Sequence, residues 1–269
     1  NVTSYLAARL VSEGKIRWET TFFSLFPKLK DKVNPAYHAM TLKDLLSHRA
    51  RVRPYSTTAE LVAFPKLRGN DVQQRRKFVQ EVLNNPPGDT GLVYSNGGVA
   101  LAAIMLEMVS QKTYKGLLDK YLTKEFGVRA YMGWPNQFGE MQPWGHWMPN
   151  SKQVLFTPVS KAENASISTL FSPACHLSMT LRDMMRFYQV QLRGIQGKHP
   201  RIPKQTYELM HYGLPTYSLG WLHKQDPGSR VSTHDGSAGT FYAHVTLLPD
   251  VDLGILIVTN TAGGPTNEA

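Results

Sequence analysis

The pattern of apolar and polar positions predicts helices along most of the chain. Residues 4–13 carry apolar side chains at helical spacing, and Gly14 follows them, where a glycine ends a helix well. Residues 99–109 are apolar on nearly every face, which predicts a helix in the protein interior that is too short to span a membrane. Further helices are predicted at 42–48, 71–83, 181–192 and 203–212, with Thr41, Asp71 and Thr180 as N-caps of the first three.

Strand-like segments gather near the C-terminal end. Residues Tyr217–Leu222, Phe241–Leu248 and Leu253–Thr259 are rich in β-branched and aromatic side chains. The residues Pro249–Asp252 join the last two segments and have a suitable length for a hairpin connection. Both faces of these strands are largely apolar, so we expect helices or loops to cover both sides of the sheet.

Residues 130–160 form a long segment without a regular pattern. This segment holds Trp134, Trp144 and Trp147 together with several prolines and glycines. Long irregular segments inside compact proteins tend to be either functional or disordered, and three tryptophans favour order here.

Composition and charge narrow the class of protein. Of the 269 residues, 42 % are hydrophobic and 19 % are charged, which permits a packed core and argues against disorder. The net charge of +10 does not indicate a nucleic-acid partner, because the basic residues are scattered along the chain. Their densest cluster, 73–77, is more typical of the solvated face of a helix. A basic surface would still attract anionic partners.

The cysteine and histidine patterns argue against a metal or cofactor site. The single cysteine, Cys175, excludes an internal disulfide and a cysteine-ligated metal cage. No histidine spacing is typical of a metal site, and neither a Walker loop nor a dinucleotide fingerprint is present. We therefore expect no metal and no cofactor.

The first candidate motif is Tyr94-Ser95-Asn96, just before the predicted interior helix. In extended backbone, residues two apart point the same way, so the Tyr94 phenol and the Asn96 amide would face one site. The alternative is that Asn96 is only an N-cap and Tyr94 a surface aromatic residue.

The second candidate motif runs from His234 to Gly239 and precedes a predicted strand. Glycines beside a strand let a ligand approach the backbone closely, or they form only a bulge or a turn. Two other pairs are poor candidates. The neighbours Ser47 and His48 would diverge by about 100° on a helix. The one Ser-x-x-Lys match, Ser12 to Lys15, contains Gly14, which ends the helix.

Taken together, the motifs resemble one family over nearly the whole chain. The residues that carry the resemblance are, in order, Leu45-Leu46-Ser47-His48-Arg49-Ala50, Tyr94-Ser95-Asn96, Pro173-Ala174 with Asp183 and Arg186-Phe187, Tyr217-Ser218-Leu219-Gly220-Trp221, and His234-Asp235-Gly236. This set resembles the serine β-lactamase-like family of class C β-lactamases, penicillin-binding DD-peptidases, D-aminopeptidases and related esterases. The resemblance implies an α/β (α+β) fold in a single catalytic domain over 1–269. Residues 1–40 and 171–269 would form an antiparallel sheet with flanking helices, and 41–170 a mostly helical part.

The resemblance also implies that the nucleophile lies outside this chain. Residues 10–16 resemble the end of the family's nucleophile helix, and counting back places the Ser-x-x-Lys motif just upstream of Asn1. The chain therefore looks truncated at both ends relative to the family. The family is mostly periplasmic or secreted, and its substrates are small molecules or peptides; the pattern specifies no oligomeric state.

The roles that the resemblance implies belong to an acyl-enzyme mechanism on an amide, ester or β-lactam carbonyl. Tyr94 would be the general base, and His234 would take the place of the lysine in the family's Lys-Thr-Gly motif. Asn96 would hold the lysine amine or a substrate amide, and Gly236 would let the substrate reach the strand edge. The backbone N–H of Ser237 would be one oxyanion-hole donor.

Two departures from the family pattern keep an alternative open. Arg51 stands where the family often has glycine, and Cys175-His176 replaces small residues after Pro173-Ala174. The alternative is a non-catalytic relative that serves as a binding or scaffold domain.

Overall fold

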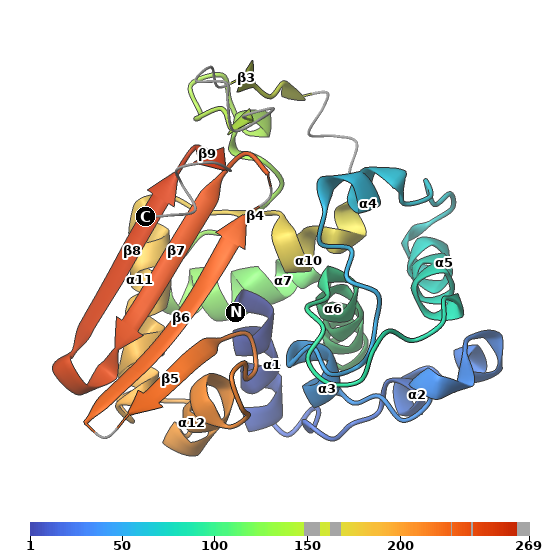
Figure 1. The fold of residues 1–269 in the computed structure, drawn as a ribbon, viewed down its shortest axis with the longest axis horizontal. Coiled ribbons are helices and arrows are strands. Elements are labelled where there is room, and N and C mark those ends of the chain that lie inside the picture. The colour runs from blue at the N-terminus through green and yellow to red at the C-terminus, as the bar shows by residue number, and fades with distance from the viewer. Residues whose placement is uncertain (148–156, 162–167, 227, 238, 263–269) are drawn as a thin grey trace.

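An antiparallel sheet and a group of helices lie on either side of helix α1 (Val2–Ser12) (Figure 1). The computed structural model describes residues 1–147, 157–161, 168–226, 228–237 and 239–262. The other α-helices are α2 (Phe22–Leu25), α3 (Leu42–Leu46), α4 (Thr58–Ala63), α5 (Asp71–Asn84), α6 (Asn96–Ser110), α7 (Tyr114–Leu118), α8 (Lys124–Phe126), α10 (Ser172–Cys175), α11 (Leu181–Ile195) and α12 (Lys204–Tyr212).

The main sheet has the strand order β5-β6-β7-β8 and is antiparallel throughout. Its strands are β5 (Leu222–Asp226), β6 (Ser229–Ser237), β7 (Tyr242–Leu248) and β8 (Leu253–Thr259). Shorter strands form two small sheets, β1-β4 and β3-β2-β9, from β1 (Tyr131–Met132), β2 (His146–Trp147), β3 (Thr157–Pro158), β4 (Leu177–Ser178) and β9 (Thr261–Ala262). Helix α11 packs against β7 and β8 and lies behind the sheet in Figure 1. The predicted fold class, an antiparallel sheet flanked by helices, is confirmed.

Side-chain caps explain where several helices begin. Thr41 and Asp44 form a capping box at the start of α3, and Thr180 caps α11 through the Asp183 N–H, as predicted. The predicted cap Asp71 is wrong, because Asn70 caps α5 from one position earlier. Helix α1 ends before Gly14, which has φ +70°.

Helix α6 forms the centre of the helical part. It is buried along most of its length and contacts α1, α3 and α10. Its N-cap is Ser95, whose Oγ accepts a hydrogen bond from the Gly98 N–H at 2.9 Å. Helices α3 to α8 all lie in the part predicted to be mostly helical; the boundaries of the predicted single domain stay a prediction.

The strand predictions need three corrections. The segment 217–221 is a turn rather than a strand, because Thr216 and Gly220 adopt φ +64° and +86°. Strand β6 was missed, so His234 lies within a strand and not before one. Both faces of the sheet were expected to be covered, yet β8 exposes 37–46 % of four apolar residues in the described part of the chain: Leu253, Ile255, Ile257 and Val258.

The irregular segment 130–160 lies partly outside the described residues. The described part holds the short strands β1 to β3. Trp134 is buried, whereas Trp144 and Trp147 are 37 % and 52 % exposed. Across the described ranges, no helix is long and apolar enough to cross a membrane.

Candidate active site

The turn after α3 buries a histidine between the helical part and the sheet. His48 is 2 % exposed and has φ +58°, a backbone conformation that histidine adopts more readily than most residues. Its Nδ1 accepts a hydrogen bond from the Ser95 N–H at 3.1 Å, which ties the turn to the cap of α6. Burial lowers the pKa of His48 to about 3, so the ring is neutral at neutral pH.

Tyr94 packs directly on this histidine. The ring centroids of Tyr94 and His48 are 4.2 Å apart, and the Val93 N–H donates to the His48 carbonyl oxygen at 2.9 Å. Tyr94 is 39 % exposed as a residue, yet desolvation of its hydroxyl raises the pKa to about 12, with Cys175 adding to the shift. The Tyr94 ring is therefore partly exposed, whereas its hydroxyl is desolvated.

Tyr217 connects Tyr94 to the sheet. Its hydroxyl is 3.2 Å from His48 Nε2, and its ring centroid is 6.3 Å from Tyr94 and 6.5 Å from His234. It is only 4 % exposed, and burial raises its pKa well above the ordinary value. The structure thus brings Tyr94 and His234 into one cluster with His48 and Tyr217, which we call the aromatic cluster.

His234 faces the cluster from strand β6. It pairs with Val245 of β7, and its ring lies 6.4 Å from that of Trp221. Burial lowers its pKa well below the usual value. The neutral form is therefore favoured at neutral pH, so hydrogen bonding suits His234 better than the partial positive charge considered from the sequence.

The last residues of β6 present a free strand edge. Strand β5 pairs with β6 only as far as Thr233, whereas β7 pairs with it as far as Ser237. No described strand therefore pairs with the other edge of residues 234–237. A Cβ added to Gly236 would meet only the Ala243 carbonyl oxygen, at 3.9 Å, so the backbone is open to a close approach.

Asn96 and Ser237 are placed differently from each other. Asn96 is 6 % exposed and begins α6, and its Nδ2 donates to the Tyr55 carbonyl oxygen at 2.8 Å. The prediction that the backbone is extended through Asn96 is therefore wrong. The alternative, that Asn96 is only an N-cap, is also wrong, since Ser95 is the cap. Ser237 is exposed at the end of β6. The binding roles of both residues stay predictions.

The start of α1 reaches the same place. A Cβ on Gly220 would lie 2.8 Å from Ser4 Oγ and 3.0 Å from Asn1 Cα, so the first turn of α1 packs on the Tyr217–Trp221 turn. Figure 1 shows the N-terminus between the sheet and the helices. By contrast, Lys15 lies at the far end of α1, where it pairs with Glu13 at 3.3 Å, so the Ser12 to Lys15 match is not part of the site.

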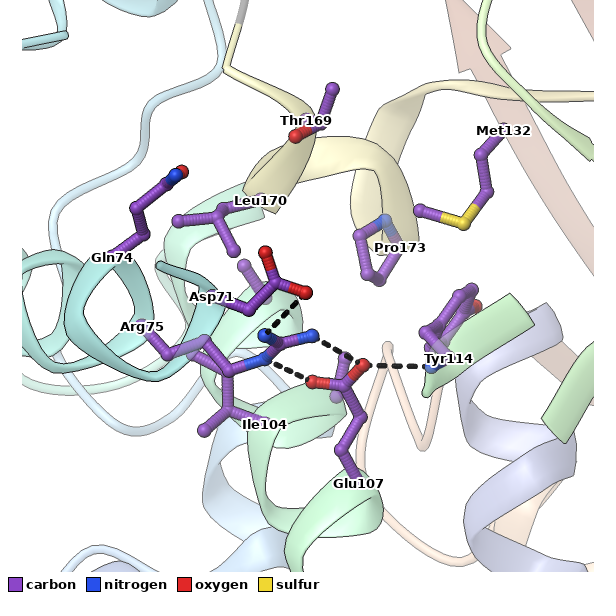
Figure 2. Close-up of a pocket in the computed structure, with 12 residues that line it drawn as sticks. Asp71, Gln74, Arg75, Ile104, Glu107, Tyr114, Met132, Thr169, Leu170 and Pro173 are labelled. Atoms are coloured by element: carbon purple, nitrogen blue, oxygen red, sulfur yellow. Dashed lines mark hydrogen bonds and ion pairs between the residues drawn. The ribbon is translucent and has the colours of Figure 1, made fainter. Parts of the chain in front are cut away.

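A separate cavity of about 140 Å³ lies between α5, α6 and α10 (Figure 2). Its polar groups already bind one another. Arg75 Nε is 2.6 Å from Glu107 Oε2, and Glu107 Oε1 accepts from the Tyr114 N–H at 2.7 Å. No residue of the aromatic cluster lines this cavity. We therefore assign it a structural role, since its buried charges, Arg75 and Glu107, bind each other.

Solved structures of known proteins share this architecture. A solved class C β-lactamase matches with a TM-score of 0.75 at 15 % identity, covering 99 % of this chain and 76 % of that one. The D-alanine carboxypeptidase AmpC from Burkholderia cenocepacia gives 0.74 at 17 % identity, over 99 % and 78 %. The fold is therefore that of β-lactamases and penicillin-binding protein homologues.

The chain belongs to the Beta-lactamase family, whose model matches residues 2–269. This confirms the resemblance seen in the sequence. Protein flp from Staphylococcus aureus (strain COL) is 22 % identical over 264 residues, and the match covers 96 % of this chain and 50 % of that protein. The chain thus spans about half the length of the curated relatives it matches.

In the described ranges, no group of three or more His, Cys, Asp or Glu side chains could hold a metal ion.

Proposed function

We propose that the full protein is a serine hydrolase that forms an acyl-enzyme with an amide, ester or β-lactam carbonyl. One observation carries this proposal: Tyr94 belongs to the aromatic cluster that the free edge of β6 and the first turn of α1 also reach. A Ser-x-x-Lys motif just upstream of Asn1 would continue α1 into this cluster. Membership of the Beta-lactamase family supports the reaction class.

The state of Tyr94 defines what the upstream lysine must do. With a pKa of about 12, the phenol is neutral at pH 7 in the described surroundings. Lowering that pKa to about 7 requires roughly 7 kcal/mol of added stabilisation of the phenolate. Neither His48 nor His234 supplies a cation, because burial keeps both rings neutral. A lysine ammonium beside Tyr94 would provide this stabilisation, and Tyr94 could then take the proton of the serine hydroxyl.

The free edge of β6 would hold the acyl group. An extended substrate segment can pair with residues 234–237, where no described strand competes for the backbone groups. The Ser237 N–H would donate to the oxyanion of the tetrahedral intermediate, a contact worth about 3 kcal/mol in comparable enzymes.

Labelling of the full-length protein tests this function. A fluorescent penicillin and a fluorophosphonate probe should each be tried, followed by mass spectrometry to locate the adduct. We expect an adduct on a serine upstream of Asn1, lost when that serine is replaced by alanine. The absence of any adduct, together with no turnover of p-nitrophenyl esters, would instead indicate the non-catalytic relative.

A further inference from the structure

His48 has a defined tautomer because of its two partners. The Ser95 backbone N–H can only donate, so Nδ1 must accept and carries no proton. The ring proton of the neutral imidazole is then on Nε2, 3.2 Å from the Tyr217 hydroxyl. His48 therefore donates to the oxygen of Tyr217, and the hydroxyl proton of Tyr217 is free to point elsewhere.

The next residue holds the backbone of the same tyrosine. Arg49 Nη1 donates to the Tyr217 carbonyl oxygen at 2.8 Å, and Nη2 donates to the Pro215 carbonyl oxygen at 2.8 Å. Arg49 forms no ion pair within the described ranges, and its guanidinium donates hydrogen bonds to backbone carbonyl groups instead. His48 thus binds the Tyr217 hydroxyl, and the adjacent Arg49 binds the Tyr217 main chain.

We propose that His48 is a positioning residue of the active site, which orients Tyr94 through ring contact and Tyr217 through its Nε2–H. The proposal rests on the proposed function, because it names what holds the general base of that reaction. His48 does not itself move protons. Its Nδ1 is occupied by a backbone N–H, and the loss of that bond would leave a buried donor without a partner.

The groups around the ring agree with a neutral positioning role. The titratable and charged groups near His48 are Tyr94, Tyr217, His234 and the Arg49 guanidinium, together with the start of α1. Among the described residues none of these is a carboxylate, so nothing here stabilises an imidazolium.

Paired substitutions in the full-length protein test the arrangement. In His48→Asn, the Asn Oδ1 can still accept from Ser95 and the residue tolerates the left-handed backbone, but the donor to Tyr217 is lost. Tyr217→Phe removes only the hydroxyl. We expect each variant to lower kcat for a p-nitrophenyl ester about 10- to 100-fold with KM changed by less than about threefold, and the double variant to lose no more than the worse single one.

A matched control variant separates positioning from general damage. His199 also accepts backbone N–H groups at Nδ1, from Arg201 and Ile202. Its ring contacts Tyr5, Phe126 and Tyr207, none of which belongs to the aromatic cluster. His199→Asn should leave kcat within about twofold of the wild-type value. Single-variant losses that multiply in the double variant, or a kcat unchanged by His48→Asn, would overturn the proposal.

A spectroscopic readout is independent of catalysis. In ¹⁵N-histidine-labelled full-length protein, long-range ¹H–¹⁵N spectra should show His48 as the Nε2–H tautomer without titration between pH 5 and 9. A titrating ring or an Nδ1–H tautomer would overturn the proposal. If the wild-type protein forms no adduct, the proposed function fails, whereas these spectra still decide whether the His48–Tyr217 bond exists.

Discussion

The ring of Tyr207 occupies the space that a side chain on Gly194 would need. A Cβ on Gly194 would lie 2.1 Å from Tyr207 Cζ, so α11 and α12 pack with a buried tyrosine against bare backbone. This contact joins the helix that covers the sheet to the helix that leads into the Tyr217 turn.

Gly194→Ala should therefore destabilise the protein by about 3 kcal/mol or more, because an inserted methyl group overpacks a rigid core. Gly14 is the matched control: it has φ +70° but no atom within 4 Å of an added Cβ. Gly14→Ala should cost only about 1 kcal/mol, from backbone strain. Urea denaturation of both variants measures the difference, and equal losses would contradict this account.

Tyr94→Phe should lower kcat of the full protein about 10²- to 10⁴-fold, as expected for loss of a general base. The ring contact with His48 is kept, so the free energy of unfolding should change by less than about 1 kcal/mol. Tyr131, which is 42 % exposed on β1, provides the control. Tyr131→Phe should leave kcat unchanged in the same ester assay, and an active Tyr94→Phe enzyme would remove Tyr94 from the mechanism.

Stability should fall in mild acid because the fold buries neutral histidines. Burial lowers the pKa of His48 to about 3 and that of His211 well below the usual value. Below about pH 6.5 the unfolded chain binds protons at these sites and the folded chain does not. Their stabilising contribution is therefore complete above pH 6.5 and is lost as the pH falls toward the folded pKa values.

The expected slope is up to about 1.4 kcal/mol per pH unit for each such histidine between pH 4 and 6. Urea titrations at half-unit steps measure it. His211→Gln should reduce the slope, because burial lowers the pKa of His211 well below its usual value. A flat profile across this range would show that these rings are protonated in the folded state.

Glu107 should contribute to stability without affecting catalysis. It binds Arg75 through two hydrogen bonds, at 2.6 and 2.9 Å, and accepts from the Tyr114 N–H (Figure 2). Glu107→Gln should cost about 1–3 kcal/mol, since a half-buried guanidinium loses its charged partner. Glu19→Gln, which removes an exposed pair with Lys43 at 3.8 Å, should cost less than about 0.5 kcal/mol. A double-mutant cycle with Arg75→Met would isolate the coupling.

The sequence predicted most helices because their signals are local. The cap Thr180 and the start of α11 at Leu181 are neighbours in the chain, and the apolar run of α6 needs no distant partner to be recognised. Strand β6 was missed because its inward side chains are polar. Ser232 is buried, and its hydroxyl is satisfied by a hydrogen bond with His211 at 2.7 Å. The two residues are 21 positions apart, so the sequence around Ser232 does not reveal this contact.

The same reasoning explains the partial success at the site. Tyr94 and His234 stand in short motifs, so they could be named. His48 is a poor catalytic partner for its neighbour Ser47, and the segment 45–50 marks it only as part of the family resemblance. Its actual partners, Ser95 and Tyr217, are 47 and 169 positions away, and no local pattern reveals them.

The aromatic cluster draws His48, Tyr94, Tyr217 and His234 from four distant segments of the chain. Assembly of these rings requires that the helical part, the Tyr217 turn and the sheet have all docked. Recovery of ester turnover after dilution from denaturant would then report the last folding event, whereas circular dichroism would register the helices as they form. A lag between the two signals would measure the time between formation of the helices and recovery of ester turnover.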